Sequence, residues 1–180
     1  MTDYTRRDMP DDGPVCEAIR TQRAVRRFDG RSIDDDTLLR ILDAGRRAPS
    51  SMNEQRWSFV VVTDRDRLRE LSRLGGYAGH VADAAAAVAL VTPDADEGWR
   101  RESIAFDLGQ SAQNMMLCAW ASGIGSAHAA VFDQDLARSV LRYPDDARCD
   151  YVLSFGYPAE RPRGEGARRP LDAVVHRDRW

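Results

Sequence analysis

The sequence predicts one α/β or α+β domain, in which helices pack around a sheet. Short apolar runs, typical of buried strands, alternate along the chain with longer stretches in which apolar residues recur at helical spacing. The chain has 180 residues, of which 43% are hydrophobic and 31% charged, as in an ordinary globular protein with a sizeable core. No internal repeat is visible. We expect a flexible, polar N-terminus at 1–13 and a single domain over 14–180.

The helices are predicted from apolar residues that recur every three or four positions. The clearest case is 34–48, where Leu38 and Ile41 share a face and Asp34 or Asp35 can cap the start. The longest predicted helix, 99–121, carries an apolar stripe and ends before Gly123, a residue suited to a helix C-terminus. In chain order, the helices are expected at 14–23, 34–48, 64–74, 99–121 and 134–141.

The strands are predicted from short apolar runs bounded by turn residues. Phe59–Val62 is the clearest, whereas the run from Ala84 is alanine-rich and leaves a helix as an alternative. A glycine-rich connection is expected at 75–80, and the Pro-, Gly- and Arg-rich tail from Tyr157 onward is expected to form an extended arm. In chain order, the strands are expected at 58–63, 84–91, 125–131 and 150–156.

The basic residues of this chain are all arginine. The net charge is −3, with 26 arginines, 29 acidic residues and no lysine. A phosphate-loop lysine, a Schiff-base lysine and a lysine general base are therefore excluded. A bound phosphate would need arginine, backbone amides or a helix N-terminus. The acidic balance and the dispersed arginines disfavour nucleic acid as a partner.

Neither a membrane span nor a metal centre is expected. The longest apolar run, Ala84–Val91, is too short to cross a bilayer, and 1–13 does not resemble a signal peptide. Three cysteines are an odd number without a CxxC pair, which disfavours a disulfide framework or a zinc site and favours the cytoplasm. The three histidines are too dispersed for a local metal site.

The most informative segment is 48–57, between the second helix and the first strand. Pro49 ends the helix, because its ring clashes with the preceding turn and it lacks an N–H. Hydroxyl and amide side chains follow, namely Ser50, Ser51, Asn53 and Gln55. Two interpretations stay open: a capped helix-to-strand loop, or a turn whose donors and acceptors bind a planar polar ligand.

Two further segments are candidates for ligand binding. Arginines and apolar residues mix over 20–28, which indicates either a solvated basic face or side chains that turn inward. Gly123 and Gly125 precede the third strand, but they follow a helix and lack the third glycine of a dinucleotide fingerprint, so a Rossmann site is disfavoured. No Ser-His-Asp pattern is discernible.

These motifs, in this order, resemble the FMN-dependent nitroreductase family. Ala-Pro-Ser-Ser-x-Asn-x-Gln followed by Trp, at 48–57, resembles the family's signature loop. The segment 20–28 resembles the part that grips the flavin phosphate, 123–133 the strand beside the isoalloxazine ring, and 168–175 the closing motif. The stretch 107–114 is similar to the long central helix, which forms the dimer core in relatives.

The chain departs from the family pattern at four positions. Gln22 stands where the family has arginine and Ala24 where it has serine. Gly166 stands where a lysine is common, so phosphate recognition would involve fewer charges. Arg56 replaces the usual proline before Trp57, which would add a donor and a charge at the mouth of the loop.

The resemblance implies an FMN site built from several segments. Arg23, Arg26 and Arg168 would bind the phosphate or the polar edge of the flavin, and the amide near Ala130 would donate to the flavin N5. No side chain is implied as catalytic and no metal is implied, because the flavin carries the chemistry. The residues implied to bind the cofactor are Gln22, Arg23, Ala24, Val25, Arg26, Pro49, Ser50, Ser51, Asn53, Gln113, His128, Ala129, Ala130, Arg168 and Arg169.

The resemblance also implies a fold, a partner and an activity. The fold would be an α+β sandwich with a mostly antiparallel sheet, in a homodimer. Hydride would pass from NADH or NADPH through FMN to a small organic acceptor, nitroaromatic or quinone-like. Two alternatives remain on the same fold: a specialised flavin reaction, such as flavin fragmentation or dehalogenation, and a non-catalytic protein that binds or stores flavin.

Overall fold

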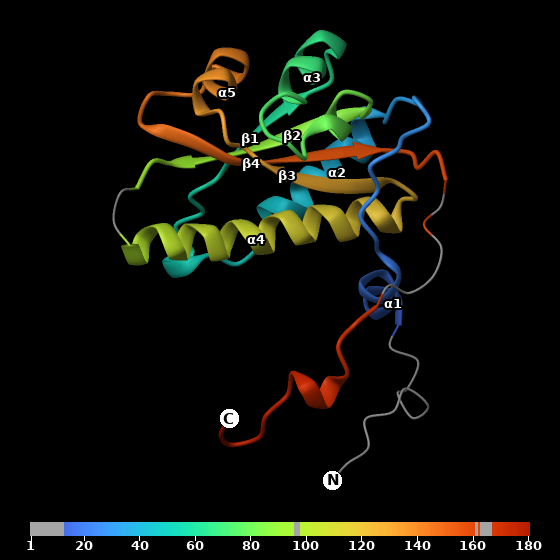
Figure 1. Ribbon diagram of the computed structural model, residues 1–180, viewed down its shortest axis with the longest axis vertical. Helices are drawn as coiled ribbons and strands as arrows, with labels where there is room; N and C mark the ends of the chain where they lie inside the picture. Colours follow the sequence, from blue (N-terminus) through green and yellow to red (C-terminus); the bar gives the residue numbers. More distant parts are fainter. Residues whose placement is uncertain (1–12, 96–97, 161, 163–166) are drawn as a thin grey trace.

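Four antiparallel strands form the central sheet of this protein. The computed structural model describes residues 13–95, 98–160, 162 and 167–180. The strands follow one another across the sheet in the order β1-β2-β4-β3, and each neighbouring pair is antiparallel (Figure 1). Their bounds are β1 Ser58–Val62, β2 Ala86–Pro93, β3 Gly125–Ala130 and β4 Ala147–Gly156. The expected α+β sandwich with a mostly antiparallel sheet is confirmed.

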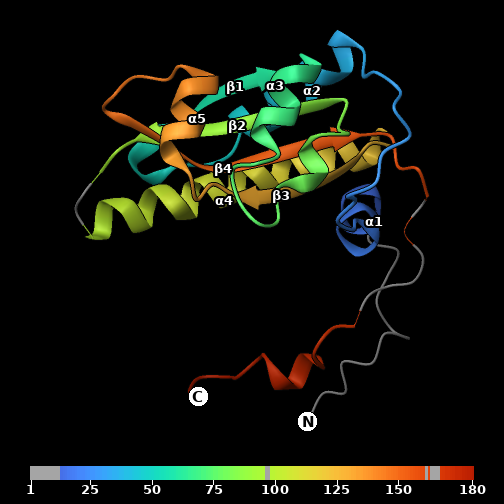
Figure 2. The ribbon, with the colours of Figure 1, turned by 45° about the horizontal axis from the view of Figure 1, so that its top comes forward.

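Helices cover both faces of the sheet. The long helix α4 (Gly98–Ala121) and α2 (Asp35–Arg46) pack on one face, and α3 (Arg65–Leu71) and α5 (Gln134–Leu141) pack on the other, as Figures 1 and 2 show. The short helix α1 (Gly13–Thr21) lies beside the end of α4, where the Trp120 indole N–H donates to the Thr21 hydroxyl at 2.9 Å. Two apolar cores result, one on each side of the sheet.

The alanine-rich segment forms the central strand β2, so the helical alternative for it is wrong. Its side chains alternate between the two cores: Ala87 and Ala89 face α3 and α5, whereas Val88 and Leu90 face α2 and α4. Because β2 lies between β1 and β4 and has helices on both faces, small residues bring the layers close and the strand is buried almost throughout.

Aspartates begin three of the helices. Asp34 caps α2 by accepting a hydrogen bond from the Thr37 amide at 2.8 Å, which selects it over Asp35. Asp64 caps α3 and Asp133 caps α5 in the same way. Each carboxylate accepts an amide proton that has no partner within the helix, which stabilises the first turn.

All of the predicted helix and strand bounds lie within three residues of the observed ones. The strand expected at 150–156 begins at Ala147, because its first residues pair with Thr92 and Pro93 of β2. The helix expected at 64–74 ends at Leu71, and the chain then turns. Of the N-terminal segment expected to be flexible, only Gly13 lies among the described residues, and it begins α1.

The C-terminal segment leaves the sheet and extends away from the helices (Figures 1 and 2). Its residues 167–180 are exposed throughout and contain one short 3₁₀ turn, Leu171–Ala173. Where the chain is described, no helix has both the length and the apolar character that crossing a membrane would require.

Candidate functional site

Strand β3 is an edge strand, and one side of its backbone has no neighbouring strand of the sheet. The Val131 amide donates to the Asp150 carbonyl at 2.9 Å, so alternate residues of this strand point their backbone groups toward β4. The residues between these point their backbone N–H and C=O groups away from β4, namely Ser126, His128 and Ala130. The Ser126 carbonyl accepts from the Val25 amide at 2.8 Å. Among the described residues the Ala130 N–H donates to no acceptor, although Gly75 packs close to the Ala130 carbonyl on the same side.

The arginine segment runs along this edge. Ala24 forms a parallel bridge with Ser126, and Val25 is 4% exposed. Val25 fits there because Gly125 has no side chain: a Cβ on Gly125 would lie 2.6 Å from the Val25 Cβ. The segment is thus a docked strand-like element, which supports the interpretation that part of it turns inward. Arg26 is exposed beside the edge.

A buried histidine packs against the same part of the sheet. The His80 Nδ1 lies 2.8 Å from the Ser154 hydroxyl, which itself donates to the Ala127 carbonyl at 3.3 Å. If the serine proton is assigned to that carbonyl, Nδ1 is the donor to Ser154 in this contact. Burial and the Arg26 charge lower the pKa of His80 below its usual value, so a neutral imidazole is favoured. The sequence pattern predicted no role for His80.

The signature loop (48–57) has an unusual backbone and one strong attachment. Met52, Asn53 and Gln55 have left-handed φ values of 52°, 57° and 49°. The Ser51 amide donates to Asp107 Oδ2 at 2.9 Å and the Ser51 hydroxyl to Oδ1 at 3.3 Å. Asp107 lies on α4 and is only 4% exposed. This pairing spans 56 positions of sequence and was not predicted.

The expectation that Arg56 adds a charge at the mouth of the loop is wrong. Its side chain is only 7% exposed, and it is paired with Glu54. The Glu54 carboxylate accepts from the Arg56 guanidinium, and this hydrogen bond lowers the pKa of Glu54. The arginine that replaces the family's proline is therefore largely folded inward.

Within one chain, the predicted site residues lie in four places. Residues 22–26 and 128–130 meet at the β3 edge. The signature loop leads directly into β1, which is the opposite edge of the four-stranded sheet. Arg168 and Arg169 lie on the exposed arm, where they donate to the carbonyls of Ala167 and Ala173. Gln113 lines a groove along α4 of about 290 Å³ that also reaches His128.

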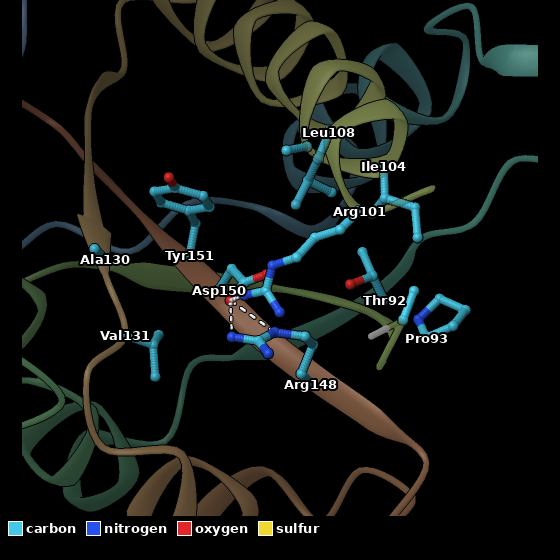
Figure 3. A pocket seen from close by; sticks show the side chains of 12 residues that line it. Thr92, Pro93, Arg101, Ile104, Leu108, Ala130, Val131, Arg148, Asp150 and Tyr151 are labelled. Atoms are coloured by element: carbon cyan, nitrogen blue, oxygen red, sulfur yellow. Dashed lines mark hydrogen bonds and ion pairs between the residues drawn. The ribbon is translucent and has the colours of Figure 1, made fainter. Parts of the chain in front are cut away.

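A second cavity, of about 230 Å³, lies beside the C-terminal end of β3 (Figure 3). Ala130, Tyr151 and Leu108 line it together with charged side chains. Arg148 donates to Asp150 at 2.8 Å, and Arg101 lies 3.9 Å from the same carboxylate. Sequence patterns could not indicate this cavity, because its walls come from β2, β3, β4 and α4.

The described residues contain no cluster of His, Cys, Asp and Glu side chains that could hold a metal ion. The three cysteines are free thiols. Cys149 is fully buried, and burial raises the pKa of its thiol to about 12, so it is a core residue rather than a nucleophile.

The sheet order, the two helical layers and the docked arginine segment define an α+β protein of the nitroreductase fold. The family model described as "Nitroreductase family" matches residues 19–104. A protein from Archaeoglobus fulgidus, provisionally named an NADH dehydrogenase/NAD(P)H nitroreductase, is 30% identical over 167 residues, which cover 90% of this chain and 96% of that protein. The chain therefore belongs to the nitroreductase family.

Two further comparisons agree with this assignment. The NADPH-flavin oxidoreductase of Vibrio harveyi is 28% identical over 179 residues, covering 92% of this chain and 74% of the relative. The solved structure of NADPH:FMN oxidoreductase from Vibrio harveyi, complexed with NAD⁺, superimposes with a TM-score of 0.84 at 26% identity and covers 93% of this chain and 78% of that one.

Proposed function

We propose that this protein is an FMN-dependent oxidoreductase that passes hydride from NADH or NADPH to a small organic acceptor, nitroaromatic or quinone-like. Family membership supports an NAD(P)H-dependent oxidoreductase, and the printed names of relatives include NADPH-flavin oxidoreductase and NADPH:FMN oxidoreductase. The observation that carries the proposal is the outer side of β3. There the Ala130 N–H, pointing away from β4, lies on the same edge as the docked segment that carries Arg26.

The residues at this edge fit a flavin. A backbone N–H that the sheet leaves without a strand partner suits the N5 position, and the side chains of Ala129 and Ala130 are small enough for close approach. Arg26 supplies positive charge beside the edge, which would favour an anionic reduced ring. Bound FMN would supply the hydride-accepting and hydride-donating atom, so no protein nucleophile is needed.

Phosphate binding falls to the arginines at both ends of the chain. Arg23 donates to the carbonyls of Arg20 at 2.8 Å and Gln22 at 2.6 Å, which fixes its guanidinium at the end of α1. We expect Arg23→Ala and Arg168→Ala each to weaken FMN binding by about 1.5–3 kcal/mol, the range for charge-assisted hydrogen bonds. Riboflavin, which lacks the phosphate, should be affected much less. Arg69→Ala, on the exposed surface of α3, is the matched control.

The proposal includes a homodimer, because one chain does not assemble the whole site. The signature loop leads into β1, and β1 and β3 are the opposite edges of the sheet, roughly 14 Å apart across three strand spacings. α4 also exposes large apolar side chains, with Trp99 62% and Phe106 72% exposed. A second copy that covers α4 would bury this surface and bring its own loop and arm to the first chain's β3 edge.

The first test is the cofactor content of the purified protein. Heat-released supernatant should have the absorbance and mass of FMN, and the bound flavin should be bleached by NADH or NADPH. FAD, or no flavin after reconstitution, would contradict the proposal. A yellow protein inert to both nucleotides would favour a flavin-storage protein or a special donor instead.

The second test follows the assembly. Sedimentation across a dilution series, with flavin fluorescence recorded in parallel, should show the dimer dissociating and the flavin leaving together. A monomer that keeps its flavin at full occupancy would exclude a site that draws on both chains.

A further inference from the structure

The signature loop adopts a backbone that its own sequence does not favour. Three of the four residues Met52, Asn53, Glu54 and Gln55 have left-handed φ angles, and none of them is glycine. This conformation crowds a Cβ against the backbone, so it persists only where surrounding contacts enforce it. Met52 is 76% exposed, so its own side chain does not hold the loop in place. Hydrogen bonds within the loop hold part of this path, such as those from the Asn53 amide to the Ser50 carbonyl and from the Gln55 amide to the Ser50 hydroxyl. A further contact comes from an element that the loop packs against.

That contact is the pair of hydrogen bonds from Ser51 to Asp107. A carboxylate that is 4% exposed is retained only where hydrogen bonds satisfy it, and both of its oxygens accept from Ser51. Ser103, one turn earlier on α4, donates its hydroxyl to the Ser51 hydroxyl at 2.7 Å. Ser51 is therefore tied to α4 by three hydrogen bonds directly before the left-handed residues.

The two serines of the motif have different surroundings. The Ser51 hydroxyl donates to Asp107 and accepts from Ser103, so its proton is already used. The Ser50 hydroxyl accepts from the Gln55 amide at 3.0 Å, and among the described residues its own proton has no acceptor. Ser50 can therefore donate to a ligand, whereas Ser51 holds the loop.

We propose that Asp107 is a positioning residue: through Ser51 it holds the signature loop in the path that presents Ser50 and Asn53 to the cofactor. The identity of that cofactor rests on the proposed function, but the anchor itself does not. In an Asp107→Asn variant only one of the two terminal atoms can accept, so one bond from Ser51 is lost while the shape is kept. Glu102→Gln, an exposed acid on the same helix, is the matched control.

The anchor is tested first in flavin-free protein by hydrogen exchange with mass spectrometry. Peptides covering 50–56 should exchange at least about tenfold faster in Asp107→Asn, and the sheet and Glu102→Gln should be unchanged. Ser51→Ala, which removes only the hydroxyl, should give a smaller change, and combining it with Asp107→Asn should add little because both remove the same contact. Unchanged exchange of 50–56 in a folded Asp107→Asn variant would overturn the proposal.

Flavin binding gives the second measurement. Asp107→Asn should raise the Kd for FMN about tenfold and change the visible circular dichroism of the flavin at saturation, which a general loss of stability would not do. If wild-type protein binds no flavin, the proposed function fails while the exchange result still decides the anchor. Should Asp107→Asn not fold, Ser51→Ala and Ser103→Ala decide: faster exchange of 50–56 in both supports the anchor, and normal exchange in both overturns it.

Discussion

A single methyl group added to Gly125 should dislodge the arginine segment from the sheet. An alanine Cβ at this position would lie 2.6 Å from the Cβ and Cγ2 of Val25 and 2.8 Å from its Cγ1. These atoms are close to the backbone of a β-branched residue, so a rotamer change cannot relieve all three contacts. The segment must move, and the hydrogen bond from the Val25 amide to the Ser126 carbonyl would be lost or lengthened.

The size of the effect follows from what the movement releases. Full exposure of Val25, now 4% exposed, would cost about 1.5–3 kcal/mol, and loss of the backbone hydrogen bond about 0.5–1.5 kcal/mol. A partial movement of the segment would relieve part of the clash without exposing Val25 fully. We therefore expect a loss of about 1–3 kcal/mol in the free energy of unfolding, the usual range for overpacking. FMN binding should weaken in parallel, because Arg23 and Arg26 move with the segment.

Urea unfolding at one protein concentration, followed by tryptophan fluorescence, measures the loss of stability, and FMN titration measures the second effect. Gly76→Ala is the control, because no atom lies within 4 Å of the added Cβ. Val25→Gly removes all three clashing atoms, so its combination with Gly125→Ala should lose less than the sum of the two single changes. Wild-type stability and FMN affinity in Gly125→Ala would refute the reasoning.

Three further predictions concern separate groups. Cys149 should resist iodoacetamide at pH 8 in the native protein while exposed Cys16 reacts, as counted by mass spectrometry, because burial raises the pKa of Cys149 to about 12; modification of both would contradict this. Folding lowers the pKa of His80, so the unfolded state binds more protons and the stability of the protein should fall as the pH drops through about 6.5. Melting temperatures measured across this pH range should therefore depend less on pH in His80→Asn than in wild type or in the exposed-site control His176→Asn. Equal slopes in all three proteins would be evidence against this prediction. Asp34→Ala removes the α2 cap and should lower the free energy of unfolding by about 1 kcal/mol in a urea titration, so an unchanged value would show that the cap is not stabilising.

The agreement between expected and observed elements has a local cause. Helical spacing identified α2 and α4, and an apolar run identified β1, because the side-chain period of each element is written directly in the sequence. The start of β4 at Ala147 was missed because those residues are ordered by pairing with Thr92 and Pro93 of another strand. The interior direction of Arg56 was missed because its partner and its burial depend on the folded loop.

The sequence by itself determined the class of fold, the family motifs and their order, and a lysine-free chain in which arginine is the permanently charged side chain available for a phosphate. The tertiary structure decided the strand order β1-β2-β4-β3, which leaves β3 without a neighbouring strand on one side and makes β1, into which the signature loop leads, the other edge. It also decided that Asp107 holds Ser51. Short-range patterns encode which face of an element is apolar, whereas edges, cavities and contacts across 56 residues arise only when distant elements pack together.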